Sequence, residues 1–244
     1  ATLETYRSLL KMLHIDRAVL VQPSVYGTDN RAMLAALKQY PQQFRGVAVI
    51  SSNPNKATDK ELESLHQAGV RGIRCNIVDV ADPSVGLPID NLRALANKIK
   101  PFGWHLELLM HVNEYPNLAT VFEHFPVDLV FGHFGYCHAK QGIQNPGFQG
   151  LLELLKNGHT WVKMTGPYRI SDGDLPYLDM QPFNDALLKA NPSRLVWGTD
   201  WPHPNVREMP DDGKLVDLLP LFTSDASLMH KLLVDNPTRL YWYD

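Results

Sequence analysis

A single carboxylate follows a short apolar run near the C-terminus. Residues 194–204 read Arg-Leu-Val-Trp-Gly-Thr-Asp-Trp-Pro-His-Pro, so that Asp200 comes just after Leu195, Val196 and Trp197. In parallel α/β folds the catalytic groups stand where strands end, and this pattern predicts such a position for Asp200. The alternative is that Asp200 only caps the next loop or helix, as aspartate often does.

Two histidines end similar runs. In residues 128–136 the imidazole of His133 stands between glycines, which allow close approach of the backbone, and we predict a functional role for it. In residues 104–111 the last residue is His111, which could act as a ligand or as an acid or base. For His111 we favour a hydrogen-bonded structural histidine.

Two arginines occur three residues apart in one predicted strand. Side chains alternate along a strand, so Arg71 and Arg74 should point to opposite faces. One of them would be buried and would need an anionic partner, either a structural acid or a substrate carboxylate. Arg74 lies nearer the carboxyl end of the strand, and its planar guanidinium suits bidentate binding of a carboxylate.

Two connections carry further polar candidates. After the first strand, Ser24 and Tyr26 could hydrogen-bond a ligand, although turn chemistry is the alternative for this segment. The connection 166–182 is long and polar, which predicts an active-site loop that brings Tyr168 and Arg169 over the strand ends.

Strand-like apolar runs alternate with amphipathic helical patterns along the whole chain. This alternation predicts one parallel α/β domain over residues 1–244. A doubly wound sheet is the alternative, but no Gly-rich phosphate turn follows any run. The chain opens on a helix, and seven strands cannot close a barrel of eight, so we expect a first strand that is missing from this sequence. The expected strands are residues 17–24, 45–50, 70–77, 104–111, 128–134, 160–166 and 194–200.

Composition excludes several classes of protein. A formal net charge of −3 gives no basic footprint for nucleic acid or an anionic membrane. No apolar run approaches the roughly 20 residues of a membrane span, and the N-terminus has no signal-peptide pattern. Two cysteines imply no disulfide framework and fit a reducing cytosol, so we expect a cytoplasmic protein, monomeric or homo-oligomeric.

These segments, taken in order, resemble the amidohydrolase superfamily, in the branch similar to 2-pyrone-4,6-dicarboxylate lactonases of aromatic catabolism. The resemblance implies a (β/α)₈ TIM-like barrel with its active site at the carboxyl ends of the strands. The matching segments are residues 21–30, 69–74, 128–135, 162–171, 197–203 and 236–240.

The resemblance also implies a role for each matching residue. Asp200 would be the general base that activates water, and His133 would bind or polarise the scissile group. Arg74 and Arg169 would hold substrate carboxylates. The pocket would also be lined by Ser24, Tyr26, Tyr168 and His111.

The metal site of some relatives is incomplete in this sequence. The His-x-His pair of the family's first strand is missing, and where metal-dependent relatives keep a histidine this chain has Leu109, with His111 two residues on. A metal such as zinc would have to rest on His133, Asp200 and the displaced His111, so we expect no metal cofactor.

The leading hypothesis is therefore a hydrolase that opens the lactone of a small, anionic, aromatic-derived acid. Its partner would be a small-molecule carboxylate substrate. One alternative is a metal-dependent decarboxylase or amidohydrolase of the same superfamily. The other is a barrel that binds a carboxylate without turning it over.

Overall fold

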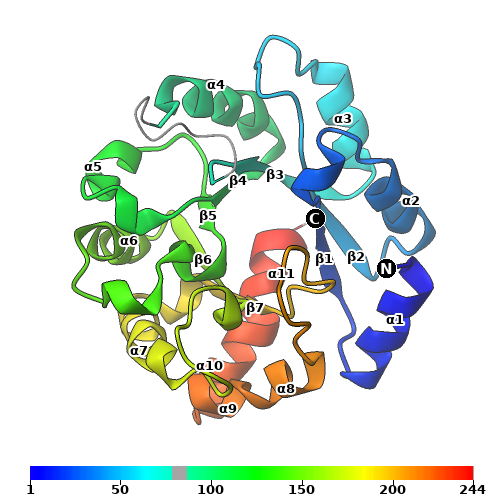
Figure 1. The fold of residues 1–244 in the computed structure, drawn as a ribbon. Coiled ribbons are helices and arrows are strands. Elements are labelled where there is room, and N and C mark those ends of the chain that lie inside the picture. The colour runs from blue at the N-terminus through cyan, green and yellow to red at the C-terminus, as the bar shows by residue number, and fades with distance from the viewer. Residues whose placement is uncertain (79–86, 244) are drawn as a thin grey trace. The chain divides into compact units, whose positions relative to one another are not determined.

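The computed structural model describes residues 1–78 and 87–243. All seven predicted strands are present, each shorter than predicted, and helices separate them (Figure 1). The strands are β1 (Ala18–Val21), β2 (Phe44–Ala48), β3 (Val70–Asn76), β4 (His105–Leu109), β5 (Leu129–Phe131), β6 (Thr160–Thr165) and β7 (Leu195–Gly198). The helices are α1 (Leu3–Met12), α2 (Arg31–Gln39), α3 (Asp59–Gln67), α4 (Ile89–Ile99), α5 (Leu118–Phe122), α6 (Pro146–Lys156), α7 (Gln181–Ala190), α8 (Asp212–Asp217), α9 (Leu219–Phe222), α10 (Ala226–His230) and α11 (Asn236–Tyr241).

Internal contacts divide the chain into two compact units. The first unit comprises Ala1–Leu108 and Phe125–Leu129, and the second comprises Leu109–His124 and Val130–Asp244. Strands β1 to β4 belong mainly to the first unit, and β5 to β7 mainly to the second.

In the first unit the strands follow one another in chain order, β1-β2-β3-β4. The pairs β1–β2 and β2–β3 are parallel, and α2 packs against β2 while α3 packs against β3 (Figure 1). Buried apolar side chains fill these contacts, among them Leu37, Phe44 and Leu62. A doubly wound sheet would reverse its strand order at the first strand, so the one-directional order argues against that alternative.

The second unit repeats the same arrangement. Strands β5, β6 and β7 follow in chain order, and β6 pairs with β7 in parallel, with Val162 opposite Leu195 and Thr165 opposite Gly198. Helix α6 packs against β6, and α11 packs against β7. The prediction of parallel strands alternating with helices is confirmed, and it is the repeat from which a (β/α) barrel is built.

All seven predicted strand ends were placed too far along the chain. Strand β7 ends at Gly198 and β5 ends at Phe131, so Asp200 and His133 each stand two residues beyond a strand instead of closing it. Both residues have left-handed backbones, with φ of 69° and 49°, which no strand ladder accepts. His111 likewise follows the end of β4 and begins a 3₁₀ turn.

Strands β3 and β4 share a polar layer within the first unit. The side chain of Arg74 lies beside that of Glu107, with Nε 3.9 Å from Oε1, and the His105 ring lies over Gly72. A Cβ atom on Gly72 would stand 2.4 Å from His105 Nε2 and 2.5 Å from Cε1. Because Gly72 has no side chain, the buried ring of His105 can pack directly against the backbone of β3. This contact is two residues from Arg74 in the same strand.

No helix within residues 1–78 and 87–243 is long and apolar enough to cross a membrane. Cys75 and Cys137 are both free thiols.

The Gly72 contact leads to a test of packing. We expect Gly72→Ala to lower the free energy of unfolding by about 1–3 kcal/mol, because the new methyl group overpacks a site whose neighbour is a buried ring. Gly173→Ala is the matched control, since its Cβ would meet nothing closer than 3.5 Å. Denaturant unfolding of both variants measures the difference, and equal midpoints would contradict the packing argument.

Candidate active site

The polar residues of the second unit gather around Asp200. Its Oδ2 atom accepts a hydrogen bond from Arg169 Nε at 2.5 Å and another from the Tyr168 hydroxyl at 2.7 Å. Its Oδ1 atom lies 3.9 Å from Nε2 of His133. The Asp200 side chain is only 18% exposed. Four residues predicted from the sequence are thus brought together in one cluster.

The register of β6 and β7 explains this convergence. Thr165 and Gly198 are opposite each other at the ends of the two strands, so the residues that follow both strands share one edge. Gly166 has a φ of 57° and begins the turn that carries Tyr168 and Arg169. A Cβ atom on Gly166 would stand 3.0 Å from both Asp200 Oδ2 and His133 Nδ1, so a larger residue would press on the cluster.

Opposing effects set the charge of Asp200. Burial alone would raise its pKa, but the electrostatic effects of His133 and Arg169 and the hydrogen bonds from Tyr168 and Arg169 outweigh burial and lower it. Burial likewise would lower the pKa of Arg169, whereas the Asp200 charge raises it. The two residues therefore form a charged pair at neutral pH.

His133 is neutral beside this pair. Desolvation lowers its pKa to about 4, against the opposing effect of Asp200. Its Nδ1 atom lies 3.2 Å from the backbone oxygen and 3.0 Å from the hydroxyl oxygen of Thr165. A backbone oxygen can only accept, so we assign the single ring proton to Nδ1. The Nε2 atom then carries a lone pair and faces Asp200 as an acceptor.

A second histidine extends the cluster and was not given a role from the sequence. The Tyr168 hydroxyl lies 2.8 Å from Nδ1 of His203, whose Nε2 lies 3.1 Å from Asp212 Oδ1. Burial, followed by the Asp200 charge and hydrogen bond, raises the pKa of Tyr168, so its hydroxyl stays protonated. His203 could have been found from the sequence, because it lies in the segment 197–203 that carries the resemblance. Nothing in the sequence pointed to Asp212.

His111 contacts both the backbone and the ring of Tyr136. Its Nδ1 atom lies 3.0 Å from the backbone oxygen of Tyr136, and its ring stacks 6.0 Å from that of His138. The Tyr136 ring meets the rings of both His111 and His133, at 4.7 and 5.5 Å. His111 is thus a hydrogen-bonded histidine, and its part in a binding pocket stays a prediction.

The described residues by themselves do not form a cluster of metal ligands. Nowhere within them do three or more His, Cys, Asp or Glu side chains gather as a metal site needs. Asp200 and His133 approach each other, but Arg169 and Tyr168 already occupy Oδ2 of Asp200.

The remaining candidates lie in the first unit. Arg74 donates from Nη1 to the backbone oxygen of Gln22 at 3.0 Å and lies beside the acid Glu107. Ser24 accepts a hydrogen bond from Asn76 at 2.7 Å. Tyr26 is 58% exposed.

Of the two strand arginines, Arg71 is buried and Arg74 is partly buried. Arg71 is 6% exposed and donates to the backbone oxygens of His66 and Val70, and the side chain of Arg74 is 13% exposed. Backbone carbonyls thus solvate the guanidinium of Arg71, an arrangement that side-chain alternation alone does not reveal.

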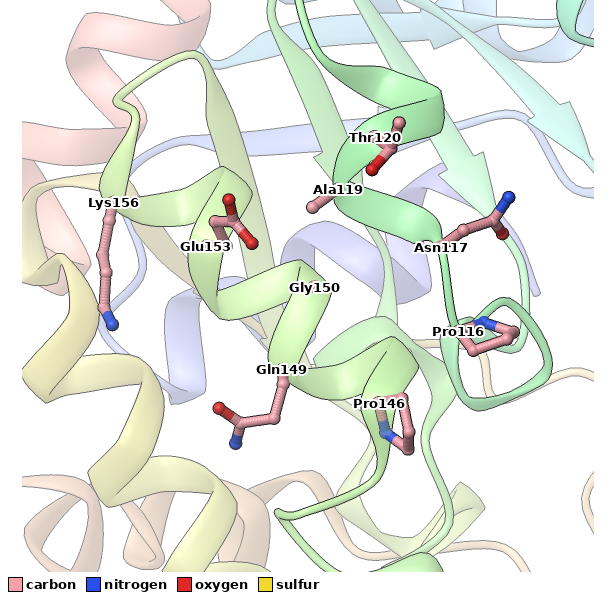
Figure 2. Close-up of a pocket in the computed structure, with 9 residues that line it drawn as sticks. All are labelled: Pro116, Asn117, Ala119, Thr120, Pro146, Gln149, Gly150, Glu153 and Lys156. Atoms are coloured by element: carbon pink, nitrogen blue, oxygen red, sulfur yellow. The ribbon is translucent and has the colours of Figure 1, made fainter.

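A surface groove of about 550 Å³ lies between α5 and α6 (Figure 2). Gln149, Glu153 and Lys156 of α6 form one side of it. None of the predicted site residues lines this groove, and its lining residues include one acid, Glu153, and no histidine. The groove therefore offers no catalytic constellation.

The neutral state of His133 leads to a prediction of pH-dependent stability. Because the pKa of His133 in the folded state lies near 4, below the ordinary histidine value of about 6.5, the unfolded chain binds more protons than the folded chain between these pH values. The contribution of His133 is complete above pH 6.5 and is lost as the pH falls towards 4, in total roughly 3 kcal/mol at about 1.4 kcal/mol per pKa unit. We expect His133→Gln to flatten this part of the unfolding curve.

The matched control is His124→Gln, because the His124 side chain is 90% exposed. Unfolding free energies measured between pH 4 and 7.5 should keep the wild-type slope in this control. A full wild-type slope in His133→Gln would show that His133 is not the titrating group.

The whole chain resembles known hydrolases. A sequence model of the family described as Amidohydrolase matches residues 1–242. The 2-pyrone-4,6-dicarboxylate hydrolase of Comamonas testosteroni is 38% identical over 237 residues, which are 93% of this chain and 76% of that protein. The 4-sulfomuconolactone hydrolase of Rhizobium radiobacter is 33% identical over 243 residues, 98% of this chain and 80% of that protein.

A solved structure shows the same likeness. The crystal structure of a probable 2-pyrone-4,6-dicarboxylic acid hydrolase from Acinetobacter baumannii, with citric acid bound, aligns with a TM-score of 0.85 and 29% identity. The alignment covers all of this chain and 90% of that chain. The predicted resemblance is confirmed, and this chain belongs to the amidohydrolase family as one of its hydrolases.

Proposed function

We propose that this protein hydrolyses the lactone of a small, anionic, aromatic-derived acid, with Asp200 as the general base. The observation that carries the proposal is the Asp200 cluster, in which an ionised carboxylate and a neutral imidazole stand together at the strand ends. The named activities of the relatives, hydrolysis of 2-pyrone-4,6-dicarboxylate and of 4-sulfomuconolactone, support this class of substrate.

The attacking water would be held between Asp200 Oδ1 and His133 Nε2. Both atoms are acceptors, and their separation of 3.9 Å lets one water donate a hydrogen bond to each. Both protons of the water are then engaged, and its oxygen lone pairs are free to attack. In this role His133 accepts a hydrogen bond from the nucleophile, whereas the resemblance alone implied that it binds or polarises the scissile group.

The chemical steps follow from this arrangement. Asp200 takes one proton as the water oxygen bonds to the lactone carbonyl carbon. The tetrahedral intermediate then collapses, the ring C–O bond breaks, and Asp200 returns the proton to the departing ring oxygen. A carboxylate with a lowered pKa is a weak base. A weak general base is sufficient here, because a lactone is an activated acyl donor.

Two arginines would fix the substrate carboxylates. Arg169 donates from Nε to Asp200 and from Nη2 to the backbone oxygen of Pro204, and its other N–H groups would bind a substrate carboxylate. Arg74 is the second proposed anchor, since its guanidinium is mostly buried and held by Gln22. Tyr168 and His111 are proposed to bind the substrate in the second unit, and the assignment of Ser24 and Tyr26 to substrate binding stays a prediction.

The proposal uses no metal and treats residues 1–244 as a single barrel domain. The family match over residues 1–242 supports the single domain. The eighth strand that closes such a barrel, with its His-x-His pair, stays a prediction.

The test is the ultraviolet-monitored hydrolysis of 2-pyrone-4,6-dicarboxylate, with and without a chelator. We expect turnover that survives chelation. Asp200→Asn should lower kcat at least about a hundredfold, because it removes the acceptor of the water proton and keeps the shape of the side chain.

Asp185→Asn is the matched control, since Asp185 is an exposed acid of α7 that hydrogen-bonds Gln181. Turnover lost on chelation would favour the metal-dependent alternative. Tight binding of the dicarboxylate without turnover would favour the binding protein. Unchanged activity in Asp200→Asn would refute the proposed base.

A second prediction concerns the arginine of the first unit. We expect Arg74→Lys to raise KM by roughly ten- to hundredfold with a smaller effect on kcat. Lysine keeps the charge but loses the planar fork, and one charge-assisted hydrogen bond is worth about 1.5–3 kcal/mol. Arg31→Lys is the control, because the Arg31 side chain is 89% exposed. An unchanged KM in Arg74→Lys would remove Arg74 from the binding site.

A further inference from the structure

We propose that His203 and Asp212 are positioning residues that hold the hydroxyl proton of Tyr168 on the Asp200 carboxylate. The inference deepens the proposed function and rests on it, because it assigns two further residues to the same base. Neither residue touches the proposed water or Asp200 side chain, so they act through Tyr168.

The four side chains form one continuous chain of contacts. Asp212 Oδ1 lies 3.1 Å from His203 Nε2, His203 Nδ1 lies 2.8 Å from the Tyr168 hydroxyl, and that hydroxyl lies 2.7 Å from Asp200 Oδ2. The interior of the chain is shielded from water, because the side chains of His203 and Asp212 are 1% and 11% exposed.

Counting protons fixes the direction of these bonds. The Tyr168 hydroxyl has one proton but touches two groups, an Asp200 oxygen and a His203 nitrogen. With Asp200 and Asp212 ionised, all three contacts are hydrogen bonds only if both nitrogens of His203 carry protons. His203 then donates to Asp212 and to Tyr168, and Tyr168 gives its single proton to Asp200.

Asp212 can pair with His203 because the neighbouring Asp211 already caps helix α8. Asp211 stands at the N-cap of α8, where its side chain accepts from the backbone N–H of Lys214 at 3.1 Å. The carboxylate of Asp212 is not needed there and pairs with the imidazole. A buried imidazolium requires such an anionic partner.

The turn between Asp200 and His203 holds the chain in place. Both residues have left-handed backbones, with φ of 69° and 56°, and the N–H of His203 donates to the backbone oxygen of Asp200 at 2.9 Å. Such conformations cost free energy and persist where surrounding contacts fix them.

The consequence for catalysis is a choice between the two oxygens of Asp200. Tyr168 and Arg169 both donate to Oδ2, which fixes the rotation of the carboxylate. Oδ1, on the side of His133, is left to take the proton of the attacking water. Without His203 as a donor, Tyr168 could turn its proton to the imidazole and leave Oδ2 with one donor fewer.

Nuclear magnetic resonance of the full chain with ¹⁵N-labelled histidine tests the proton count without any substrate. His203→Gln identifies the His203 signals by their loss. We expect both ring nitrogens of His203 to be protonated at pH 7 in the wild type, and one to lose its proton in Asp212→Asn. A singly protonated His203 in the wild type would overturn the proposal, whether or not the protein hydrolyses lactones.

Kinetics on the lactone then test the path through Tyr168. We expect His203→Gln and Asp212→Asn each to lower kcat about tenfold with little change in KM. A tenfold loss corresponds to an increase of roughly 1.4 kcal/mol in the activation free energy. In a Tyr168→Phe background the same substitutions should add almost nothing, because the hydroxyl through which they act is gone. Asp211→Asn, which keeps a capping side chain, is the matched control.

Two outcomes would count against the inference in these assays. Losses that add fully in the Tyr168→Phe background would show that His203 and Asp212 act elsewhere. A wild type without lactone turnover would refute the proposed function, and the nuclear magnetic resonance result would then decide the hydrogen-bond chain by itself.

Discussion

Keeping the Asp200 carboxylate ionised in a largely buried position costs free energy, and the Arg169 guanidinium at 2.5 Å offsets that cost. The other contacts of the cluster depend on this pair. Tyr168 can donate to Asp200 because the carboxylate is charged, and His203 is oriented in turn by the Tyr168 oxygen. Removing the charge would leave a guanidinium and a hydroxyl facing an acceptor too weak to hold both in place.

The fold supplies this pair through the register of two strands. Because Thr165 and Gly198 end β6 and β7 opposite each other, the turns that follow them meet. Gly166 keeps the space between them open, since any Cβ there would stand 3.0 Å from a polar atom of Asp200 and of His133. The Arg169–Asp200 ion pair is therefore formed entirely by the two turns that follow β6 and β7.

The sequence predicted the parts of the site that follow from strand ends. Asp200, Tyr168 and Arg169 come after apolar runs, so parallel strands bring them together. The ends of their strands were predicted less well, because left-handed turns end the pairing one or two residues earlier than the apolar pattern suggests. The contact of His203 with Asp212 could not be predicted, since it depends on the path of the loop between them.

The burial of His133 has a chemical consequence that the type of residue does not reveal. An exposed imidazole near a carboxylate would tend to be protonated and to donate to it. Such an imidazolium would compete with water for Asp200 Oδ1. Desolvation instead lowers the pKa of His133 to about 4, and Thr165 holds the ring proton on Nδ1. The pairing of a charged acceptor with a neutral one thus follows from how the two groups are compensated. Arg169 at 2.5 Å keeps the carboxylate charged, whereas the Asp200 charge, 3.9 Å from Nε2, does not outweigh the desolvation of the histidine.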